Sequence, residues 1–298
     1  MSLNSYIPTI TPKKTSMKKL FILALFSGLI LSCQKETSLD SNGSNSPEGN
    51  KSLYKVVTTY LPDNFDYYVR EFKYDSNDKI QKIKSTFKIK RNNGTIDILQ
   101  GTAQFFRDNL QRIIRIGSFP DTSSVNTIIH YTDASSTKIS SAVILKNTGS
   151  STVLLDSTVY EYGSNGMISK SSHYIPSSNG VPGLATYQVY GYDLNGNVIS
   201  KALYQDDDAN GSFEVVLTYQ WEYDDKLNPM FQDELAYFQW GELWPEYSSK
   251  NNVTKQVNVY AAIPSDQLQY SYQYDQLSRP SFQIQIGDPA NKTTYYYQ

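Results

Sequence analysis

The sequence predicts an all-β protein: an antiparallel β-meander of about 14 strands that curves into a roll or a barrel-like sheet. Two observations carry this prediction. A short aromatic motif recurs at intervals near 30 residues, and apolar and polar residues alternate with period two between its copies. The chain has 298 residues, with 25 Tyr, 2 His and 1 Cys. This composition excludes a disulfide scaffold, a Cys/His zinc site and a thiol redox centre.

The beginning of the chain carries a membrane-targeting pattern. Lys18 and Lys19 precede an apolar run, 20–31, which has the length of a signal-peptide core and is shorter than the roughly 20 residues of a spanning helix. The run ends in Ile30-Leu31-Ser32-Cys33, which resembles the lipobox of bacterial lipoproteins. The resemblance implies cleavage before Cys33 and acylation of its thiol. An ordinary signal peptide with an incidental Cys is the alternative.

We therefore expect four segments. Residues 1–16 are a non-native upstream extension with Met17 as the initiator, 17–32 the lipoprotein signal peptide, 33–52 a flexible tether rich in Ser, Asn and Gly, and 53–298 the β domain. Loss of the four lysines before Cys33 changes the formal charge from −2 to −6. A net charge of this sign disfavours nucleic acid and anionic lipid, so the lipid on Cys33 is the expected link to the membrane.

The residues that follow Cys33 indicate the membrane face on which the protein is located. Gln34-Lys35-Glu36 resembles the surface-export signals of Bacteroidetes-type lipoproteins. We therefore expect an outer-membrane lipoprotein that is exposed on the cell surface, with retention on the periplasmic face as the alternative.

The remainder of the chain repeats the pattern aromatic-x-Tyr-Asp-x-x-x-x-apolar. Its Asp-equivalent positions are 75, 108, 133, 163, 193, 224 and 275, which are 33, 25, 30, 30, 31 and 51 residues apart. The expected units are Phe72-Lys73-Tyr74-Asp75 with Ile80, Phe105-Phe106-Arg107-Asp108 with Ile113, His130-Tyr131-Thr132-Asp133 with Ile139, Tyr160-Glu161-Tyr162-Gly163 with Ile168, Tyr190-Gly191-Tyr192-Asp193 with Val198, Trp221-Glu222-Tyr223-Asp224 with Pro229, and Tyr272-Gln273-Tyr274-Asp275 with Pro280.

Each unit predicts two strands and two turns, which gives about 14 strands from seven units. Across 213–223 and 267–274, aromatic and apolar residues alternate with polar ones, as in strands with one buried face and one wet face. Asn-Gly pairs such as Asn195-Gly196 supply the positive φ angles that a tight hairpin needs. The Asp after each motif Tyr suits a strand end, where its carboxylate accepts hydrogen bonds from turn amides.

The repeat resembles known families. Tyr-Asp followed by a turn and an apolar strand is similar to the YD repeat of Rhs-type proteins. The segments Tyr223-Asp224-Asp225-Lys226-Leu227-Asn228-Pro229-Met230 and Asn251-Asn252-Val253-Thr254-Lys255 resemble those of Bacteroidetes-type YD-repeat lipoproteins, whose domain of unknown function is described as porin-like. The likeness covers residues 53–298 and implies a fold and an envelope address, without an activity. A membrane-spanning barrel is the alternative, which the Tyr-rich apolar face and the lipobox disfavour.

Two segments carry candidate chemistry. Asp206, Asp208 and Asn210 present oxygen atoms at the spacing of a calcium loop, but Leu217 replaces the bidentate Glu of an EF-hand, so an acidic hairpin loop without a cofactor is the other interpretation. The 51-residue interval contains Tyr237, Trp240 and Trp244 beside several carboxylates. These aromatic residues are candidates for ligand binding, and a packed excursion covering an end of the sheet is the alternative.

The sequence thus predicts a lipid-anchored, non-enzymatic protein of the cell envelope that binds a glycan, a peptide or an envelope component, with no nucleic-acid partner. One alternative is a hydrolase of envelope or extracellular polymer that uses carboxylates within residues 233–246. Another alternative is a purely structural envelope scaffold.

Overall fold

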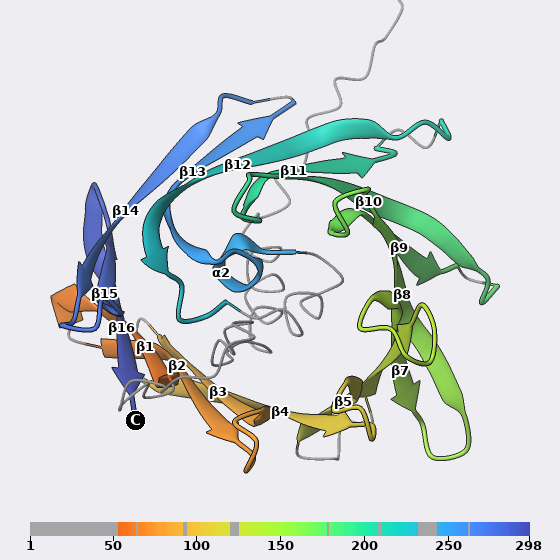
Figure 1. The fold of residues 1–298 in the computed structure, drawn as a ribbon, viewed down its shortest axis with the longest axis horizontal. Helices are drawn as coiled ribbons and strands as arrows, with labels where there is room; N and C mark the ends of the chain where they lie inside the picture. The colour runs from red at the N-terminus through yellow and green to blue at the C-terminus, as the bar shows by residue number, and fades with distance from the viewer. Residues whose placement is uncertain are drawn as a thin grey trace, which may run out of the picture.

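The computed structural model of the chain describes residues 53–63, 65–91, 94–119, 125–177, 179–207, 210–231, 243–261 and 263–298. These residues form a single antiparallel sheet of sixteen strands in which every strand pairs with its neighbours in the chain. Strand β1 also pairs with β16, so the sheet closes into a barrel (Figure 1). The strands are β1 (Leu53–Tyr60), β2 (Phe65–Tyr74), β3 (Ile80–Lys90), β4 (Ile96–Arg107), β5 (Ile113–Phe119), β6 (Val125–Tyr131), β7 (Ile139–Asn147), β8 (Thr152–Tyr162), β9 (Ile168–Pro176), β10 (Pro182–Tyr192), β11 (Val198–Gln205), β12 (Glu214–Leu227), β13 (Asn251–Tyr260), β14 (Asp266–Tyr274), β15 (Pro280–Gln285) and β16 (Asp288–Tyr297).

The prediction of an all-β, barrel-like sheet is confirmed, and the strand number is corrected from about 14 to sixteen. The seven predicted units form the seven hairpins from β2 to β15. The two additional strands, β1 and β16, flank the repeats and close the barrel by pairing with each other. The helical elements among the described residues are η1 (Leu61–Asp63) and α2 (Pro245–Ser248). Within the described ranges, no helix has the length and apolar character needed to cross a membrane.

The predicted period-two alternation separates the inner face of the barrel from its outer face. On β12, Trp221 is buried and Tyr219 packs against the core, while Gln220 and Glu222 are exposed. On β14 the tyrosines are half-buried and the intervening Gln and Ser residues are exposed. The aromatic side therefore faces the lumen, where the rings replace water, and the polar side faces out.

In the repeats that carry it, the Asp organises the turn that follows it. Asp193 Oδ1 accepts hydrogen bonds from the backbone N–H groups of Asn195 (2.9 Å) and Asn197 (2.8 Å). The same pair of contacts recurs at Asp75, Asp108 and Asp275. This confirms that the carboxylate accepts from turn amides. Gly196 has a φ of 87°, as predicted for an Asn-Gly turn.

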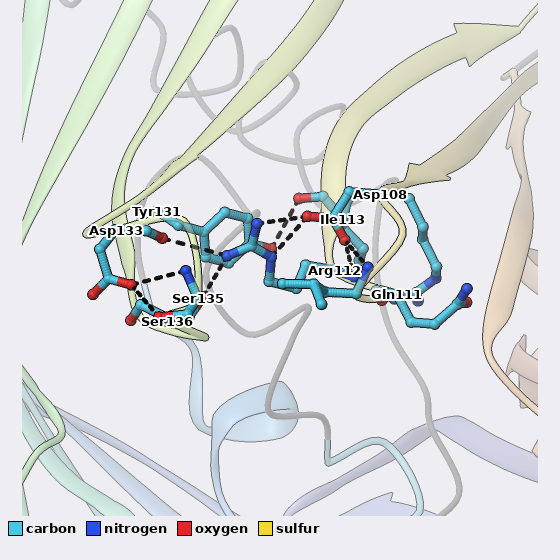
Figure 2. Close-up of polar contacts among 10 residues, drawn as sticks. Asp108, Gln111, Arg112, Ile113, Tyr131, Asp133, Ser135 and Ser136 are labelled. Carbon is cyan, nitrogen blue, oxygen red and sulfur yellow. Dashed lines mark hydrogen bonds and ion pairs between the residues drawn. The ribbon is translucent and has the colours of Figure 1, made fainter.

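In most units the motif Tyr ties its hairpin to the strand before it. Figure 2 shows this contact between β5 and β6, where the Tyr131 hydroxyl donates to the Ile113 carbonyl at 2.9 Å. In the same view the Arg112 side chain binds Asp108 and also donates to the Ser136 carbonyl at 2.7 Å. The hydroxyl-to-carbonyl contact recurs as Tyr74 to Leu53, Tyr162 to Ile139, Tyr192 to Ile168, Tyr223 to Val198 and Tyr297 to Pro280. The exceptions are the β4–β5 unit, which has Arg107 in the Tyr position, and Tyr274, whose hydroxyl bonds to Asp224.

Two predicted units need correction. Tyr131 pairs with Ile139, and the Thr132 N–H bonds to the Lys138 carbonyl, so Thr132 holds the position predicted for Asp133. In the same unit Ile129 is buried and His130 is exposed, because Ile129 lies two residues before Tyr131, as Phe72 does before Tyr74. The turn of this unit is two residues longer than in the other units.

In the Trp221 unit the buried residue paired with Tyr223 is Val253, and Pro229 lies in a turn. The reason is that residues 228–250 intervene between β12 and β13.

Candidate functional site

The connection between β12 and β13 enters the barrel. Its described parts are residues 228–231 and 243–250, and Figure 1 shows α2 within the ring of strands. Backbone bonds close the base of this connection, with the Asn228 N–H donating to the Lys250 carbonyl at 2.7 Å. Asn228 Nδ2 also donates to the carbonyls of Glu246 (2.8 Å) and Ser249 (2.9 Å). These bonds hold α2 in a fixed position relative to the end of β12.

Strands on different sides of the barrel hold the inserted segment through hydrogen bonds. Ser249 Oγ accepts a hydrogen bond from the Val198 N–H at 3.0 Å and lies 3.0 Å from the Tyr223 hydroxyl. The Leu243 N–H donates to the Tyr190 hydroxyl at 3.2 Å. On the opposite wall, Arg70 Nη1 on β2 donates to the Tyr247 hydroxyl at 2.6 Å. The segment is thus cross-linked by hydrogen bonds to β2, β10 and β11.

A buried lysine adds a further contact. Lys201 on β11 is 1% exposed, and its Nζ lies 3.4 Å from the centroid of the Trp244 ring and 4.7 Å from that of Tyr219. An ammonium group over aromatic faces is attracted by the ring quadrupoles, most strongly where water is excluded. Lys201 therefore joins β11, β12 and the inserted segment. No sequence pattern indicates this role, because a lysine on a strand is ordinarily a surface residue.

A cavity of about 170 Å³ lies between α2 and the inner faces of β1, β2 and β12–β16. This volume would hold about six water molecules at liquid density. Its lining combines five aromatic rings with amide and hydroxyl groups, one guanidinium group and one carboxylate. The lining residues are Thr58, Arg70, Trp221, Asn228, Met230, Pro245, Glu246, Tyr247, Asn252, Val253, Gln256, Tyr270, Tyr272, Gln283, Thr293 and Tyr295.

The electrostatics of the cavity centre on Glu246. Glu246 extends from α2, inside the ring of strands, into the lining of the cavity. Burial raises the pKa of Glu246, and the positive charges of Arg70 and Lys201 act in the opposite direction. Burial also raises the pKa of Tyr270 to about 12, with Glu246 adding to the effect. The tyrosine hydroxyls of the cavity are therefore neutral donors and acceptors at physiological pH.

Many lining groups are already organised by neighbouring contacts. The Trp221 indole N–H donates to Gln256 Oε1 at 3.0 Å, and Gln283 Nε2 donates to the Tyr272 hydroxyl at 2.9 Å. The Tyr295 hydroxyl lies 3.3 Å from Gln283 Oε1. Such contacts fix the ring and amide orientations before any ligand arrives, which reduces the entropy cost of binding.

The structure describes only one of the three residues of the predicted aromatic ligand site. Trp244 is inside the barrel, but its ring packs against Lys201 and Tyr219 and does not line the cavity. Tyr237 and Trp240 lie outside the described residues, as do Asp233, Glu234 and Glu242. The described end of the predicted segment enters the lumen, whereas the excursion alternative placed it over an end of the sheet. Among the described residues of the 233–246 segment, Pro245 and Glu246 line the cavity.

The predicted calcium loop is described at two of its three residues. Asp206 accepts hydrogen bonds from the backbone N–H groups of Asn210 (3.0 Å) and Gly211 (2.9 Å), and Asn210 Oδ1 accepts one from the Ser212 N–H. These contacts are those of a hairpin loop. Asp208 lies outside the described residues, as does the lipidation candidate Cys33. In the part of the chain that is described, no three His, Cys, Asp or Glu side chains are grouped to hold a metal ion.

Arg70, Lys201 and the cavity tyrosines Tyr270 and Tyr295 were not among the predicted site residues. Alternation predicts an inward direction for Arg70, Tyr270 and Tyr295, whereas Lys201 points inward because the register of β10 and β11 shifts between Val198 and Ser200. No local signal could show that β2, β14 and β16 face the same cavity as α2, because this depends on closure of the sheet.

Comparisons with known proteins identify the fold. No protein-family model matches the chain, and no curated protein matches it. Among solved structures, a porin-like protein from Bacteroides uniformis ATCC 8492 is similar, with 9% identity, a TM-score of 0.52 and coverage of 85% of this chain and 99% of that one. A porin-like protein from Bacteroides vulgatus ATCC 8482 is also similar, with 14% identity, a TM-score of 0.51 and coverage of 84% and 99%. A TcdB2-TccC3-Cdc42 complex matches 80% of this chain and 16% of that one at a TM-score of 0.25. This structural similarity is too low to indicate a relationship to Rhs-type proteins. The chain therefore shares its barrel fold with porin-like proteins of Bacteroides.

Proposed function

We propose that this chain is a lipid-anchored protein of the cell envelope that binds a saccharide unit, without enzymatic turnover, in the cavity beside α2. The observation that carries the proposal is the composition of that cavity. Trp221, Tyr270 and Tyr295 offer aromatic faces, which pack against the apolar C–H faces of sugar rings. Amide side chains and the Glu246 carboxylate offer the donors and acceptors that bind hydroxyl groups.

The charges of the cavity favour a neutral ligand. Arg70 and Glu246 contribute opposite charges to its lining, so a strongly charged ligand would leave one of them poorly compensated. A sugar ring can accept from the guanidinium group and donate to the carboxylate at once. One carboxylate lines the cavity among the described residues, whereas most glycoside hydrolases use a pair.

The proposed address rests on the lipobox that ends at Cys33 and on the barrel shared with proteins described as porin-like. Protease treatment of intact cells, with Cys33→Ala as the control for anchoring, tests it. Digestion without lysis places the barrel outside the cell, and protection until lysis places it in the periplasm. Release of the untreated Cys33→Ala variant from the membrane fraction during a wash in 1 M salt, which screens electrostatic binding, is the expected result. Its complete retention in that fraction would contradict lipid anchoring.

Saccharide binding is tested with a glycan array, followed by calorimetric titration of the glycans that bind. We expect Glu246→Gln to weaken binding about tenfold or more, since a hydrogen bond to a charged group contributes about 1.5–3 kcal/mol. Glu222→Gln is the matched control, because Glu222 is exposed on the outer face and pairs with Lys255 at 2.6 Å. Binding that both variants weaken equally, or an array on which nothing binds, would refute the luminal site.

The same variant separates the alternatives. A glycan that the protein cleaves, with cleavage lost and binding retained in Glu246→Gln, would identify a hydrolase. A purely structural scaffold would show neither cleavage nor saturable binding.

A further inference from the structure

The outer face of the barrel carries a cluster of cations on β16 and β1–β5. Strand register identifies this face. Arg70 on β2 and Ser85 on β3 are buried and paired with each other, so the alternate positions of both strands point outward. Across this set of strands, the outward positions hold Lys55, Lys73, Lys82, Lys84, Lys88, Lys90, Arg115 and Lys292, which we call the basic wall.

The placement of the cations within the basic wall destabilises the folded sheet. Lys73 is directly opposite Lys82 in the β2–β3 register, and like charges placed opposite one another destabilise a sheet. Along β3, the side chains of Lys82, Lys84, Lys88 and Lys90 lie on the outer face. They share this face because the pairing of β3 with β4 has no register shift between Lys82 and Lys90. Two carboxylates share this surface: Glu71, 3.8 Å from Lys84, and Asp66, bound to Thr59. The positive charge therefore greatly exceeds the negative charge.

On β8–β9 and β12–β13, outward lysines pair with acidic residues across strands. Lys170 on β9 lies 3.1 Å from Glu161 on β8, and Lys255 on β13 lies 2.6 Å from Glu222 on β12. This is the cross-strand pairing that stabilises a sheet. The whole chain is slightly acidic, with 29 acidic and 27 basic residues. The concentration of cations on six adjacent strands is thus a local feature that net charge does not reveal.

We infer that the basic wall docks on the anionic headgroups of the membrane that holds the lipid anchor. The wall measures roughly 25 Å by 25 Å, from a strand spacing of about 4.8 Å and a rise of about 3.3 Å per residue. The tether expected from residues 34–52 spans roughly 25 Å as a flexible chain, and it leads directly into β1, a strand of the wall. An anchor at this position holds the wall within reach of the lipid surface, where its charge is complementary to anionic lipid.

This inference shares the anchor with the proposed function, so the test removes the anchor. All sixteen strands lie within residues 53–297, and the chain from residue 33 onward with Cys33→Ala therefore carries the entire barrel. Its sedimentation with phosphatidylglycerol vesicles is compared with sedimentation on phosphatidylcholine vesicles, at low salt and at 1 M salt. We expect binding to the anionic vesicles only, and its loss at 1 M salt, where the screening length falls to about 3 Å.

A charge-matched pair of variants locates the surface. Lys84→Gln/Lys88→Gln should weaken vesicle binding at least tenfold, since a lysine near an anionic surface contributes about fivefold. Lys170→Gln/Lys255→Gln loses the same charge on other strands and should weaken it less than about threefold. Thermal unfolding confirms that both variants keep the fold.

Several results would overturn the inference: equal effects of the two variants, equal binding to both vesicle types, or binding that persists at 1 M salt. Tighter, wall-dependent binding to DNA or to heparin than to the anionic vesicles would assign the wall to an anionic polymer instead. Loss of saccharide binding in the Glu246→Gln variant is measured separately and does not affect this result.

Discussion

Each repeated residue of the motif has one physical task. The Asp carboxylate holds the turn by accepting from two backbone N–H groups, as at Asp193. The Tyr hydroxyl satisfies a carbonyl of the preceding hairpin, which Phe could not do, as at Tyr192 and Ile168 (2.6 Å). The apolar residue after the turn is buried, as Ile168 and Val198 are. The repeat therefore encodes contacts between hairpins as well as the hairpins themselves.

The turns also show where local sequence is not optimal. Asp78, Gln111 and Ser278 have φ values of 57°, 63° and 59°, in the left-handed region that the glycine of an Asn-Gly turn occupies in other units. An L-residue with a Cβ pays roughly 1 kcal/mol for this conformation, whereas Gly adopts it without strain.

We therefore predict that Ser278→Gly stabilises the barrel by up to about 1 kcal/mol, because it relieves the positive φ without removing a hydrogen bond that the Ser278 side chain makes in the structure. Equilibrium unfolding in urea measures the change. Gly196→Ala, at a φ of 87°, is the converse variant and should destabilise by a similar amount. A destabilised Ser278→Gly would show that the unfolded-state entropy of Gly dominates at this position.

At the scale of elements, the β12–β13 connection sets this barrel apart from a plain series of hairpins. The 51-residue interval in the repeat revealed an insertion, and the composition of residues 233–246 drew attention to its aromatic residues. Its direction could not be read from the sequence, since either end of the sheet or the lumen could accept it. The buried contacts of Ser249 with Val198 and Tyr223 determine that it enters the lumen.

We predict that Ser249→Ala lowers the free energy of unfolding by about 1–3 kcal/mol, because the buried Val198 N–H would lose its acceptor. Ser248→Ala is the control: its hydroxyl donates to the Trp244 carbonyl within the same segment and should cost less. Urea unfolding measures both values, and limited proteolysis should cut the 228–250 connection faster in Ser249→Ala. Equal losses in the two variants would argue against Ser249 as the anchor of the insertion.

At the scale of the whole molecule, closure of the sheet turns the tyrosine-rich face into the lining of an interior. Burial raises the pKa of Tyr162 and of Tyr270 to about 12, from an ordinary value of 10.0. A tyrosinate would need to leave this interior or bring water into it. The stability of the barrel therefore depends on the neutral form of its luminal tyrosines.

This dependence predicts alkaline unfolding with a defined sign. The folded pKa values lie above the unfolded ones, so the stabilisation from these neutral hydroxyls is complete below pH 10 and is lost as the pH rises toward about 12. Urea unfolding at several pH values, with tyrosinate absorbance followed in parallel, should show falling stability over this interval. Unchanged stability up to pH 12 would mean that water already reaches the tyrosines of the lumen.

Local sequence patterns were sufficient to predict the repeated strands, the turns, the Asp contacts and the order of the hairpins. These follow from period-two alternation and turn chemistry, which act over a few residues. The repeat spacing placed the buried residue of the Trp221 unit at Pro229 instead of Val253, because the insertion displaces the returning strand by more than twenty residues. It missed the one-residue shift at Thr132 for a similar reason, an extended turn.

The environments of the two faces of the sheet depend on closure of the barrel. Pairing of β1 with β16 joins residues more than 230 positions apart. This pairing closes the sheet, so that one face lines the lumen and the other forms the outer surface of the barrel. The cavity at Glu246, the buried Lys201 and the basic wall all arise from that closure. Their residues come from strands distant in the chain, so no window of sequence contains them together.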